Sequence, residues 1–256
     1  MAAPAHVPAP DTEALEATRG LLRGARLLAL VLIASSVWRG AAGAGDRRAG
    51  VLAAFAAAAL ALWGGATFLQ HRLLFGRHLH RQLVRGNLAA AVAAGADQVA
   101  LALITSRAIA GDTLAELPAA LAFGVLAQIT WAVFVALFRA VTTYRDDQEI
   151  AGENHAAAIS YAGAALALGA IIARAVDGPF LGWKESLGAY GTALLLAAGL
   201  YPLRQLVVEG LLLGSRPRWR GGELDRAIGQ RRSVGVAAVE AAAYLAMALL
   251  ALGHAG

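Results

Sequence analysis

The fold is decided by stretches such as HAAAISYAGAALALGAIIARAV, residues 155–176. No charged side chain lies between His155 and Arg174. A helix needs roughly 20 apolar residues to cross a hydrocarbon core that is about 30 Å thick, and this stretch meets that length. It lacks the alternation of apolar and polar residues that a membrane β-strand shows, so it predicts a transmembrane helix.

Six other stretches have the same character and are separated by charged or Gly/Pro-rich segments. The full set of predicted spans is Leu21–Trp38, Val51–Leu69, Leu88–Ile109, Pro118–Phe138, His155–Val176, Ser186–Leu203 and Val234–Leu252. We therefore expect an all-α, polytopic membrane helix bundle with about seven transmembrane helices. A cleaved signal peptide is the alternative for the first span, because Arg23 and Arg26 lie at its start. The acidic leader before it favours a retained helix.

The composition of the 256 residues agrees with this fold class. Hydrophobic residues make up 59% and charged residues 15%, whereas a soluble domain usually has about 45–50% and about 25%. There is no cysteine, which excludes thiol catalysis, disulfides and cysteine-ligated metal sites. The net charge of +5 comes from basic residues between the apolar stretches, where they act as topology signals.

The distribution of these basic residues predicts the orientation. One side of the membrane would hold Arg19, Arg23, Arg26, Arg72, Arg77, Arg81, Arg85, Arg139, Arg145, Arg216, Arg218, Arg220, Arg226, Arg231 and Arg232, with Arg204 at a helix end. The other would hold Arg39, Arg47, Arg48, Arg107, Arg174 and Lys184. Loops rich in arginine and lysine face the cytoplasm, so we expect a cytoplasmic N-terminus.

A repeated motif predicts the internal organisation. Gly86-Asn87-Leu88-Ala89-Ala90-Ala91-Val92 matches Glu153-Asn154-His155-Ala156-Ala157-Ala158-Ile159, and a weaker copy surrounds Ser233. Each full unit holds two spans, so successive units should point the same way. The expected divisions are a disordered cytoplasmic tail (1–20), an N-terminal helix pair with a basic cytoplasmic segment (21–85), two two-helix repeats (86–140 and 146–213) and a half repeat (223–256).

Asn87, Asn154 and Ser233 have the residue types favoured at helix N-caps, and capping is the first interpretation of the motif. The alternative is a site for an anion or a polar head group at clustered helix N-termini.

The run from Tyr144 to Ile159, YRDDQEIAGENHAAAI, resembles the signature of the YjfL-like inner-membrane proteins, domain-of-unknown-function family 350. The resemblance covers about Val51 to Leu252. It departs from the family pattern at Gln82-Leu83, where Glu-Ile is expected, and at Ser233, which replaces Asn. The resemblance implies an integral protein of the bacterial inner membrane and brings no established chemistry.

Three polar residues are expected at membrane depth, where such side chains are costly and often functional. Asp97 lies about 15 Å along its helix and Glu240 about 10 Å along its own. Gln128 is expected at the depth of Asp97, which predicts a hydrogen bond between the two. Polar contacts between helices are one interpretation of Asp97 and Gln128, and an ion or proton pathway is the other. Glu240 is expected either to face the bundle and hold a proton or to pair with an arginine at the cytoplasmic rim.

The acidic part of the motif, Glu149 and Glu153, is expected either to pair with arginines or to bind a cation. The sequence contains no Gly-x-Ser-x-Gly, His-Glu-x-x-His or Walker motif. We therefore expect a protein that is not an enzyme, has no cofactor or bound metal, and has the lipid bilayer rather than nucleic acid as its partner.

Passage of a small ion or solute, or a scaffold role, is the first functional hypothesis, with a homo-oligomer as an alternative to a single chain. The second is an intramembrane enzyme that acts on a lipid at the cytoplasmic interface through Glu149, Glu153 and His155. Transport requires Asp97, Gln128 and Glu240 to line one polar path. Catalysis requires the other three residues to share a pocket.

Overall fold

The computed structural model describes residues 12–75, 79–178 and 180–253, and every regular element in these ranges is helical. The elements are α1 (Thr12–Gly40), the 3-10 segment η1 (Ala41–Arg47), α2 (Arg48–Phe75), α3 (Leu79–Val84), α4 (Leu88–Ala108), the 3-10 turn η3 (Leu114–Glu116), α5 (Leu117–Val141), α6 (Asp146–Ala151), α7 (His155–Ala175), α8 (Trp183–Arg204), the π-helical η4 (Gln205–Leu212), α9 (Glu223–Gly229) and α10 (Val234–Gly253).

Six helical stretches of this part of the chain are long and apolar enough to cross a membrane. The first, Thr12–Arg72, has 61 residues and contains both α1 and α2. These helices run in opposite directions and are joined through η1, where Gly45 has a φ of 55°. Glycine adopts this positive φ without steric cost, which lets the chain reverse. The expected all-α, multi-pass bundle is therefore confirmed, and each predicted span corresponds to one long helix.

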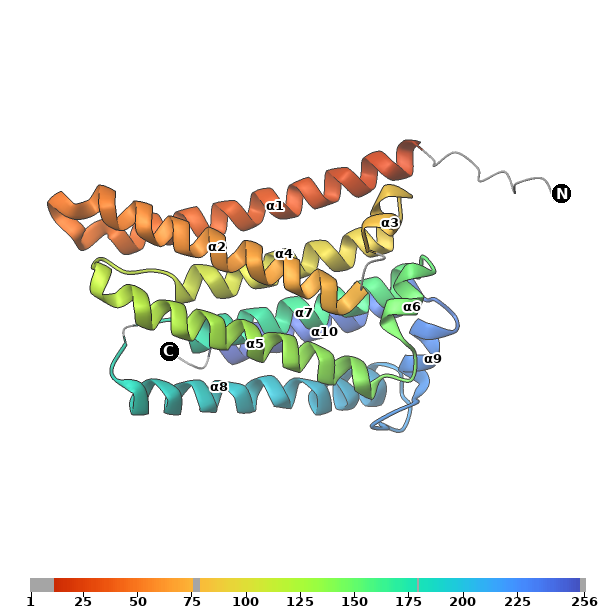
Figure 1. Cartoon of the computed structure of the whole chain (residues 1–256). Coiled ribbons are helices and arrows are strands. Elements are labelled where there is room, and N and C mark those ends of the chain that lie inside the picture. Colours follow the sequence, from red (N-terminus) through yellow and green to blue (C-terminus); the bar gives the residue numbers. More distant parts are fainter. Residues whose placement is uncertain (1–11, 76–78, 179, 254–256) are drawn as a thin grey trace.

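The long helices form two layers (Figure 1). In one layer α1, α4, α7 and α10 run in the same direction, and each packs on the next. In the other layer α2, α5 and α8 run in the opposite direction. Each of them contacts two neighbouring helices of the first layer: α2 lies on α1 and α4, α5 on α4 and α7, and α8 on α7 and α10.

Small residues let the helices of the first layer approach closely. A Cβ atom added to Gly169 of α7 would lie 2.8 Å from Ala100 Cβ of α4. A Cβ atom added to Gly163 would overlap Ala241 of α10 in the same way. Close backbone contact of this kind drives association of helices in lipid, where apolar burial supplies little energy. It also makes α4 and α7 the most buried of the long helices.

The short helices α3, α6 and α9 all lie at one end of the bundle, together with the first residues of α1, α4, α7 and α10 (Figure 1). We refer to this as the short-helix end. The chain reaches each of α4, α7 and α10 through one of these short helices.

The predicted disordered tail over residues 1–20 is wrong for its second half, because α1 already begins at Thr12. Glu13 lies in the first turn, where an acidic side chain favours the helix N-terminus. Thr18 is fully buried, and Ala14 and Leu15 contact the loop at Gly86. Tertiary packing therefore orders this leader, and residues 1–11 lie outside the described part of the chain.

Candidate functional site

Asp97 lies in the middle of α4 and is fully buried between α4 and α7. Tyr161 of α7 donates a hydrogen bond of 2.6 Å from its hydroxyl to Asp97 Oδ1. The second oxygen, Oδ2, has no hydrogen-bond partner among the described residues. A buried carboxylate oxygen without a donor is costly, so this position is a functional candidate rather than a packing solution.

The expected hydrogen bond between Asp97 and Gln128 is wrong. Gln128 Nε2 instead donates to Thr105 Oγ1 at 2.9 Å, two turns of α4 beyond Asp97. Equal depth of Gln128 and Asp97 would require Arg139, eleven residues beyond Gln128, to lie at the end of the bundle where α4 begins. In the structure Arg139 lies 5.9 Å from the ring centre of Tyr161, which is about 9 Å along α7. Gln128 is therefore displaced toward the far end of the bundle.

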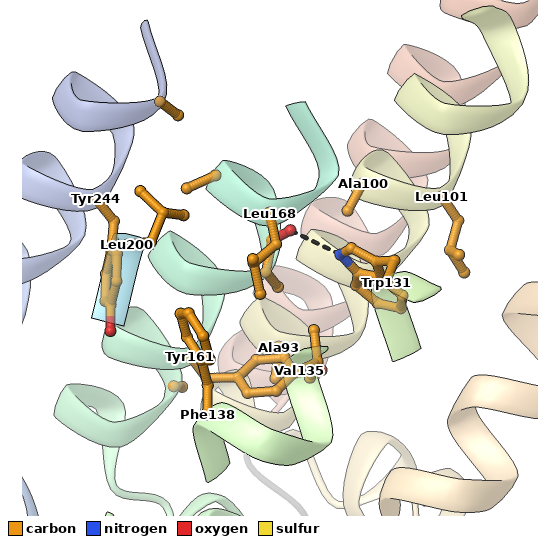
Figure 2. Close-up of a cluster of buried hydrophobic side chains, with 14 of the residues drawn as sticks. Ala93, Ala100, Leu101, Trp131, Val135, Phe138, Tyr161, Leu168, Leu200 and Tyr244 are labelled. Atoms are coloured by element: carbon orange, nitrogen blue, oxygen red, sulfur yellow. Dashed lines mark hydrogen bonds between the residues drawn. The ribbon is translucent and has the colours of Figure 1, made fainter. Parts of the chain in front are cut away.

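Apolar side chains lie between these two polar contacts along α4, and Figure 2 shows two of them, Leu101 and Trp131. Leu101 lies midway between Asp97 and Thr105 on α4 and is 1% exposed, and Trp131 of α5 is fully buried. Trp131 Nε1 donates to the carbonyl oxygen of Ala165 at 2.9 Å, which satisfies its polar atom. Leu101 and Trp131 therefore separate the Asp97 carboxylate from the far end of the bundle.

On the other side of Tyr161 lies a small cavity of about 30 Å³ between α5, α7, α8 and α10. Two arginines and two carboxylates line it, with four tyrosines and Ser160. The charged and aromatic-hydroxyl residues are Arg139, Asp146, Arg204, Glu240, Tyr144, Tyr161, Tyr201 and Tyr244. We call this set the charged cavity. Tyr161 both lines this cavity and binds Asp97, so it is the residue that the cavity and the Asp97 position share.

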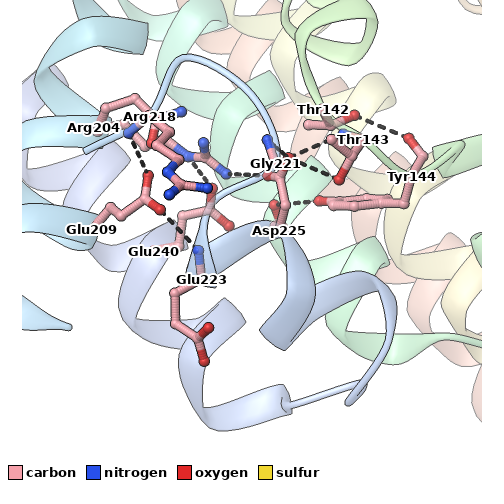
Figure 3. Close-up of polar contacts among 12 residues, drawn as sticks. Thr142, Thr143, Tyr144, Arg204, Glu209, Arg218, Gly221, Glu223, Asp225 and Glu240 are labelled. Atoms are coloured by element: carbon pink, nitrogen blue, oxygen red, sulfur yellow. Dashed lines mark hydrogen bonds and ion pairs between the residues drawn. The ribbon is translucent and has the colours of Figure 1, made fainter. Parts of the chain in front are cut away.

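The charged cavity contains a buried ion pair (Figure 3). Arg204 Nε donates to Glu240 Oε1 at 2.6 Å, and both side chains are 1% exposed. Arg204 Nη1 and Glu240 Oε2 have no hydrogen-bond partner among the described residues. A buried ion pair repays its desolvation cost only when the remaining donors and acceptors are satisfied, and here they are not. The pair is therefore poor as a stabilising element, and its two free atoms are available to bind a polar ligand.

Asp225 connects this ion pair to the loops at the short-helix end. Its Oδ1 lies 3.5 Å from Arg204 Nη2. Its Oδ2 accepts hydrogen bonds from Thr143 N at 3.0 Å, Thr143 Oγ1 at 3.1 Å and Gly221 N at 3.1 Å. One carboxylate thus ties α8 to the loops before α6 and before α9 (Figure 3).

Asp146 closes the charged cavity at the start of α6. Its Oδ2 lies 3.4 Å from Arg139 Nε, and the side chain is buried. Burial raises the pKa of Asp146 to about 7, although the neighbouring Arg139 guanidinium favours the charged form. This carboxyl group can therefore gain or lose a proton near neutral pH.

The motif residues Asn87 and Asn154 form N-caps, as their residue type predicts. Asn87 Oδ1 accepts from Ala90 N at 3.0 Å, and Asn154 Oδ1 accepts from Ala157 N at 3.1 Å. The residue before each cap, Gly86 or Glu153, has a positive φ.

The same asparagines also bind a short helix further along the chain, which the sequence interpretation did not foresee. Asn87 Nδ2 donates to the carbonyl oxygen of Ile150 in α6 at 2.8 Å, and Asn154 Nδ2 donates to that of Ile228 in α9 at 3.0 Å. Each asparagine therefore ties the start of its own long helix to the short helix that precedes the next long helix of the first layer. Ser233 has no amide to do this, and its Oγ makes only a 3.5 Å contact with Val236 N.

The acidic part of the motif does not join the charged cavity. Glu149 accepts from Asn154 Nδ2 at 2.9 Å and pairs with Arg232 at 3.4 Å, as the arginine-pairing interpretation expected. Glu153 and His155 are exposed. Within the described ranges, no cluster of three or more histidine, aspartate and glutamate side chains could hold a metal ion.

Sequence reasoning does not identify two residues of the site. It places Arg204 at the end of a helix without a partner, and it does not single out Tyr161. The available signal for Arg204 was its place at the end of an apolar run, level with a glutamate on another predicted span. Hydropathy alone does not show that two such residues face each other, because that depends on the rotation of each helix.

Comparison with known proteins gives one match. The family described as Domain of Unknown Function (DUF350) matches residues 112–253, which is more than half of the chain. This range contains every residue of the charged cavity but not Asp97. No curated protein and no solved structure matches.

Proposed function

The chain belongs to the DUF350 family, whose description assigns no activity, and from the geometry of its buried site we propose that this multi-pass membrane protein moves protons. The observation that carries the proposal is that Tyr161, which lines the charged cavity together with Glu240, also donates a hydrogen bond to Asp97. Both carboxylates keep one oxygen without a hydrogen-bond partner among the described residues.

The size of the charged cavity favours the proton over larger ions. A volume of about 30 Å³ holds roughly two water molecules when several polar groups line it. A metal cation with its hydration shell needs more room, and the two carboxylates of the cavity are already paired with its two arginines. A proton needs only hydroxyls, carboxylates and water within hydrogen-bond distance of one another.

The proposed path runs from the charged cavity to the middle of the membrane. Asp146 exchanges protons with water in the cavity, and the Tyr161 hydroxyl passes a proton to Asp97 while it accepts another. Leu101 and Trp131 close the far side of Asp97, so release there requires these side chains to move. The proposal is thus a half-channel with a gate.

The orientation belongs to the same proposal. The short-helix end carries most of the arginines, so it faces the cytoplasm, and the protein lies in the inner membrane of a bacterium. Proton movement of this kind converts no substrate, so the proposal is of a protein that is not an enzyme. We further propose that the helix pairs descend from one duplicated unit, which the recurring asparagine caps support.

A scaffold role is the second candidate, because the apolar side chains of Leu101 and Trp131 leave no open polar path beyond Asp97. In that case the buried polar groups would serve only to fix how the helices pair. The intramembrane-enzyme alternative has less support, because Glu149 is held by Asn154 and Arg232 and His155 is exposed.

Proton flux in vesicles tests the proposal. Purified protein is reconstituted with a pH-sensitive dye inside the vesicles, and a potassium diffusion potential drives proton entry. We expect faster acidification than in protein-free vesicles. Asp97→Asn should slow it by about tenfold or more, since an amide cannot carry the proton. Asp97→Asn is the decisive variant because its amide oxygen can still accept the Tyr161 hydrogen bond, so the fold is kept.

Two further variants complete the experiment. Asp146→Asn should also slow the flux, because Asp146 lines the charged cavity and can gain or lose a proton near neutral pH. Glu185→Gln makes the same carboxylate-to-amide change at an exposed position of α8 and should leave the flux unchanged. Flux no greater than in protein-free vesicles, or equal flux in all variants, rejects proton movement through this site and favours the scaffold.

A further inference from the structure

A second pocket lies at the short-helix end, outside the charged cavity. Its volume is about 260 Å³, and it opens between the end of η4 and the start of α9. The lining residues are Glu209, Ser215, Arg216, Arg218, Gly222, Glu223 and Arg226. Pockets that bind small molecules usually have volumes of about 300–1,000 Å³. A pocket slightly smaller than this fits a small polar group rather than a whole lipid or a large cofactor.

A buried glutamate fixes the loop that forms this pocket. Glu209 of η4 is 1% exposed, and its carboxylate accepts hydrogen bonds from Glu223 N at 2.8 Å and Arg218 N at 3.2 Å. Its carbonyl oxygen accepts from Ser215 N and Ser215 Oγ, both at 3.0 Å. A Cβ atom at Gly222 would overlap the Glu209 carboxylate, so only glycine fits there. The loop between η4 and α9 is therefore held in one shape.

This loop presents arginines that have no internal partner. Arg216, Arg218 and Arg220 are exposed, and none has a carboxylate partner among the described residues, although Arg226 pairs with Glu223. Glu209 is already occupied by backbone N–H groups. The unpaired positive charge of the pocket is therefore free to meet an anion, and the guanidinium fork matches phosphate oxygens.

The surroundings place the pocket at the membrane interface. Leu206 and Leu211 of η4 are 61% and 77% exposed, so this helix presents apolar side chains to lipid up to the edge of the pocket. Trp219, 68% exposed, stacks on Tyr201 at a centroid distance of 6.0 Å, and its carbonyl oxygen accepts from the Tyr201 hydroxyl at 2.7 Å. Tryptophan is enriched at the level of lipid head groups.

We propose that the pocket at Arg216 and Arg218 binds the phosphodiester head group of an anionic phospholipid, whose acyl chains lie along Leu206 and Leu211. A free phosphate would explain the arginines, but it would not explain the exposed leucines and the tryptophan beside them. The proposal does not depend on proton movement.

Native mass spectrometry of the purified protein tests the site. Phosphatidylglycerol, phosphatidylcholine and inorganic phosphate are each added to the detergent-solubilised full chain. We expect phosphatidylglycerol to bind about tenfold more tightly than phosphatidylcholine, and inorganic phosphate not to displace it. Equal binding of the two lipids, or displacement by inorganic phosphate at similar concentration, overturns the proposal.

Paired variants separate a built site from general surface charge. Arg216→Gln with Arg218→Gln should lower phosphatidylglycerol binding by about tenfold. Arg19→Gln with Arg23→Gln removes the same charge from exposed positions of α1 at the same end, and should leave the binding unchanged. Equal losses in both pairs would show diffuse attraction and reject the pocket. All four arginines are exposed, so folding is preserved, which a thermal melt of each variant checks.

Discussion

The hydroxyl of Tyr161 lies 2.6 Å from Asp97 Oδ1 and joins α7 to α4 in the middle of the bundle. The two residues stand 64 positions apart in the sequence. Their contact brings a carboxylate of α4 to the edge of the charged cavity, most of which belongs to helices further along the chain. This hydrogen bond directly joins Asp97 to a residue of the charged cavity.

Tyr161→Phe tests this link. Removal of the hydroxyl leaves Asp97 without its donor, which should lower the free energy of unfolding by about 1–3 kcal/mol. Unfolding of the detergent-solubilised protein measures the loss. In the Asp97→Leu background the same change should cost much less, because no acceptor remains. Equal costs in both backgrounds would contradict the link.

Arg204 and Glu240 should behave as a buried pair. Arg204→Met leaves Glu240 as a buried charge without its partner and should cost about 3–5 kcal/mol of unfolding free energy. The double change Arg204→Met with Glu240→Leu removes both charges and should recover most of that loss. Chemical denaturation in detergent compares the variants. A double variant less stable than Arg204→Met would argue against this account.

Asp146 should make stability depend on pH. Its pKa in the fold is about 7 and its unfolded value is 3.8, so between these values the folded protein binds more protons than the unfolded chain. The free energy of unfolding should therefore fall as pH rises from about 4 to about 7, by at most about 1.4 kcal/mol per pH unit, and level off above.

Asp146→Asn should remove this contribution. Melting temperatures at pH 5 and pH 8 measure it, because the difference between the two pH values should be smaller in the variant than in the unchanged protein. A difference of the same size in both proteins would show that Asp146 does not titrate in this range.

Each of the two asparagine caps should contribute more to the free energy of unfolding than Ser233, which precedes α10. Asn154→Ala removes a cap and the hydrogen bond to Ile228, and should cost about 1–3 kcal/mol. Ser233→Ala removes one long contact and should cost clearly less. Thermal unfolding of the two variants side by side checks the order, and a reversed order would contradict the linking role of the amide.

Much of the fold followed from local composition. The runs of about 20 apolar residues can be identified directly in the sequence, and the long helices of the structure correspond to them. Asn87 and Asn154 could be identified as caps because capping uses a side chain and a backbone group only three residues apart.

The candidate site was predicted only in part. Asp97 and Glu240 stood out because a carboxylate in an apolar run is costly wherever it points. Their partners could not be identified in this way. Gln128 was paired with Asp97 by counting residues, whereas Tyr161 is the true partner, because depth along one helix says nothing about where a neighbouring helix starts or how it is rotated.

The amino-acid sequence alone therefore predicts a bundle of membrane-spanning helices. It also identifies the helices that begin with an asparagine cap and the carboxylates that lie at membrane depth. Hydrophobicity, backbone hydrogen bonding and capping act within a single helix, so they can be read along the chain. The ion pair of Arg204 with Glu240 and the hydrogen bond of Tyr161 to Asp97 become visible in the three-dimensional structure alone, as does the charged cavity that Arg204, Glu240 and Tyr161 line. Those contacts depend on close packing at Gly163 and Gly169, which sets the distance and rotation between helices far apart in sequence.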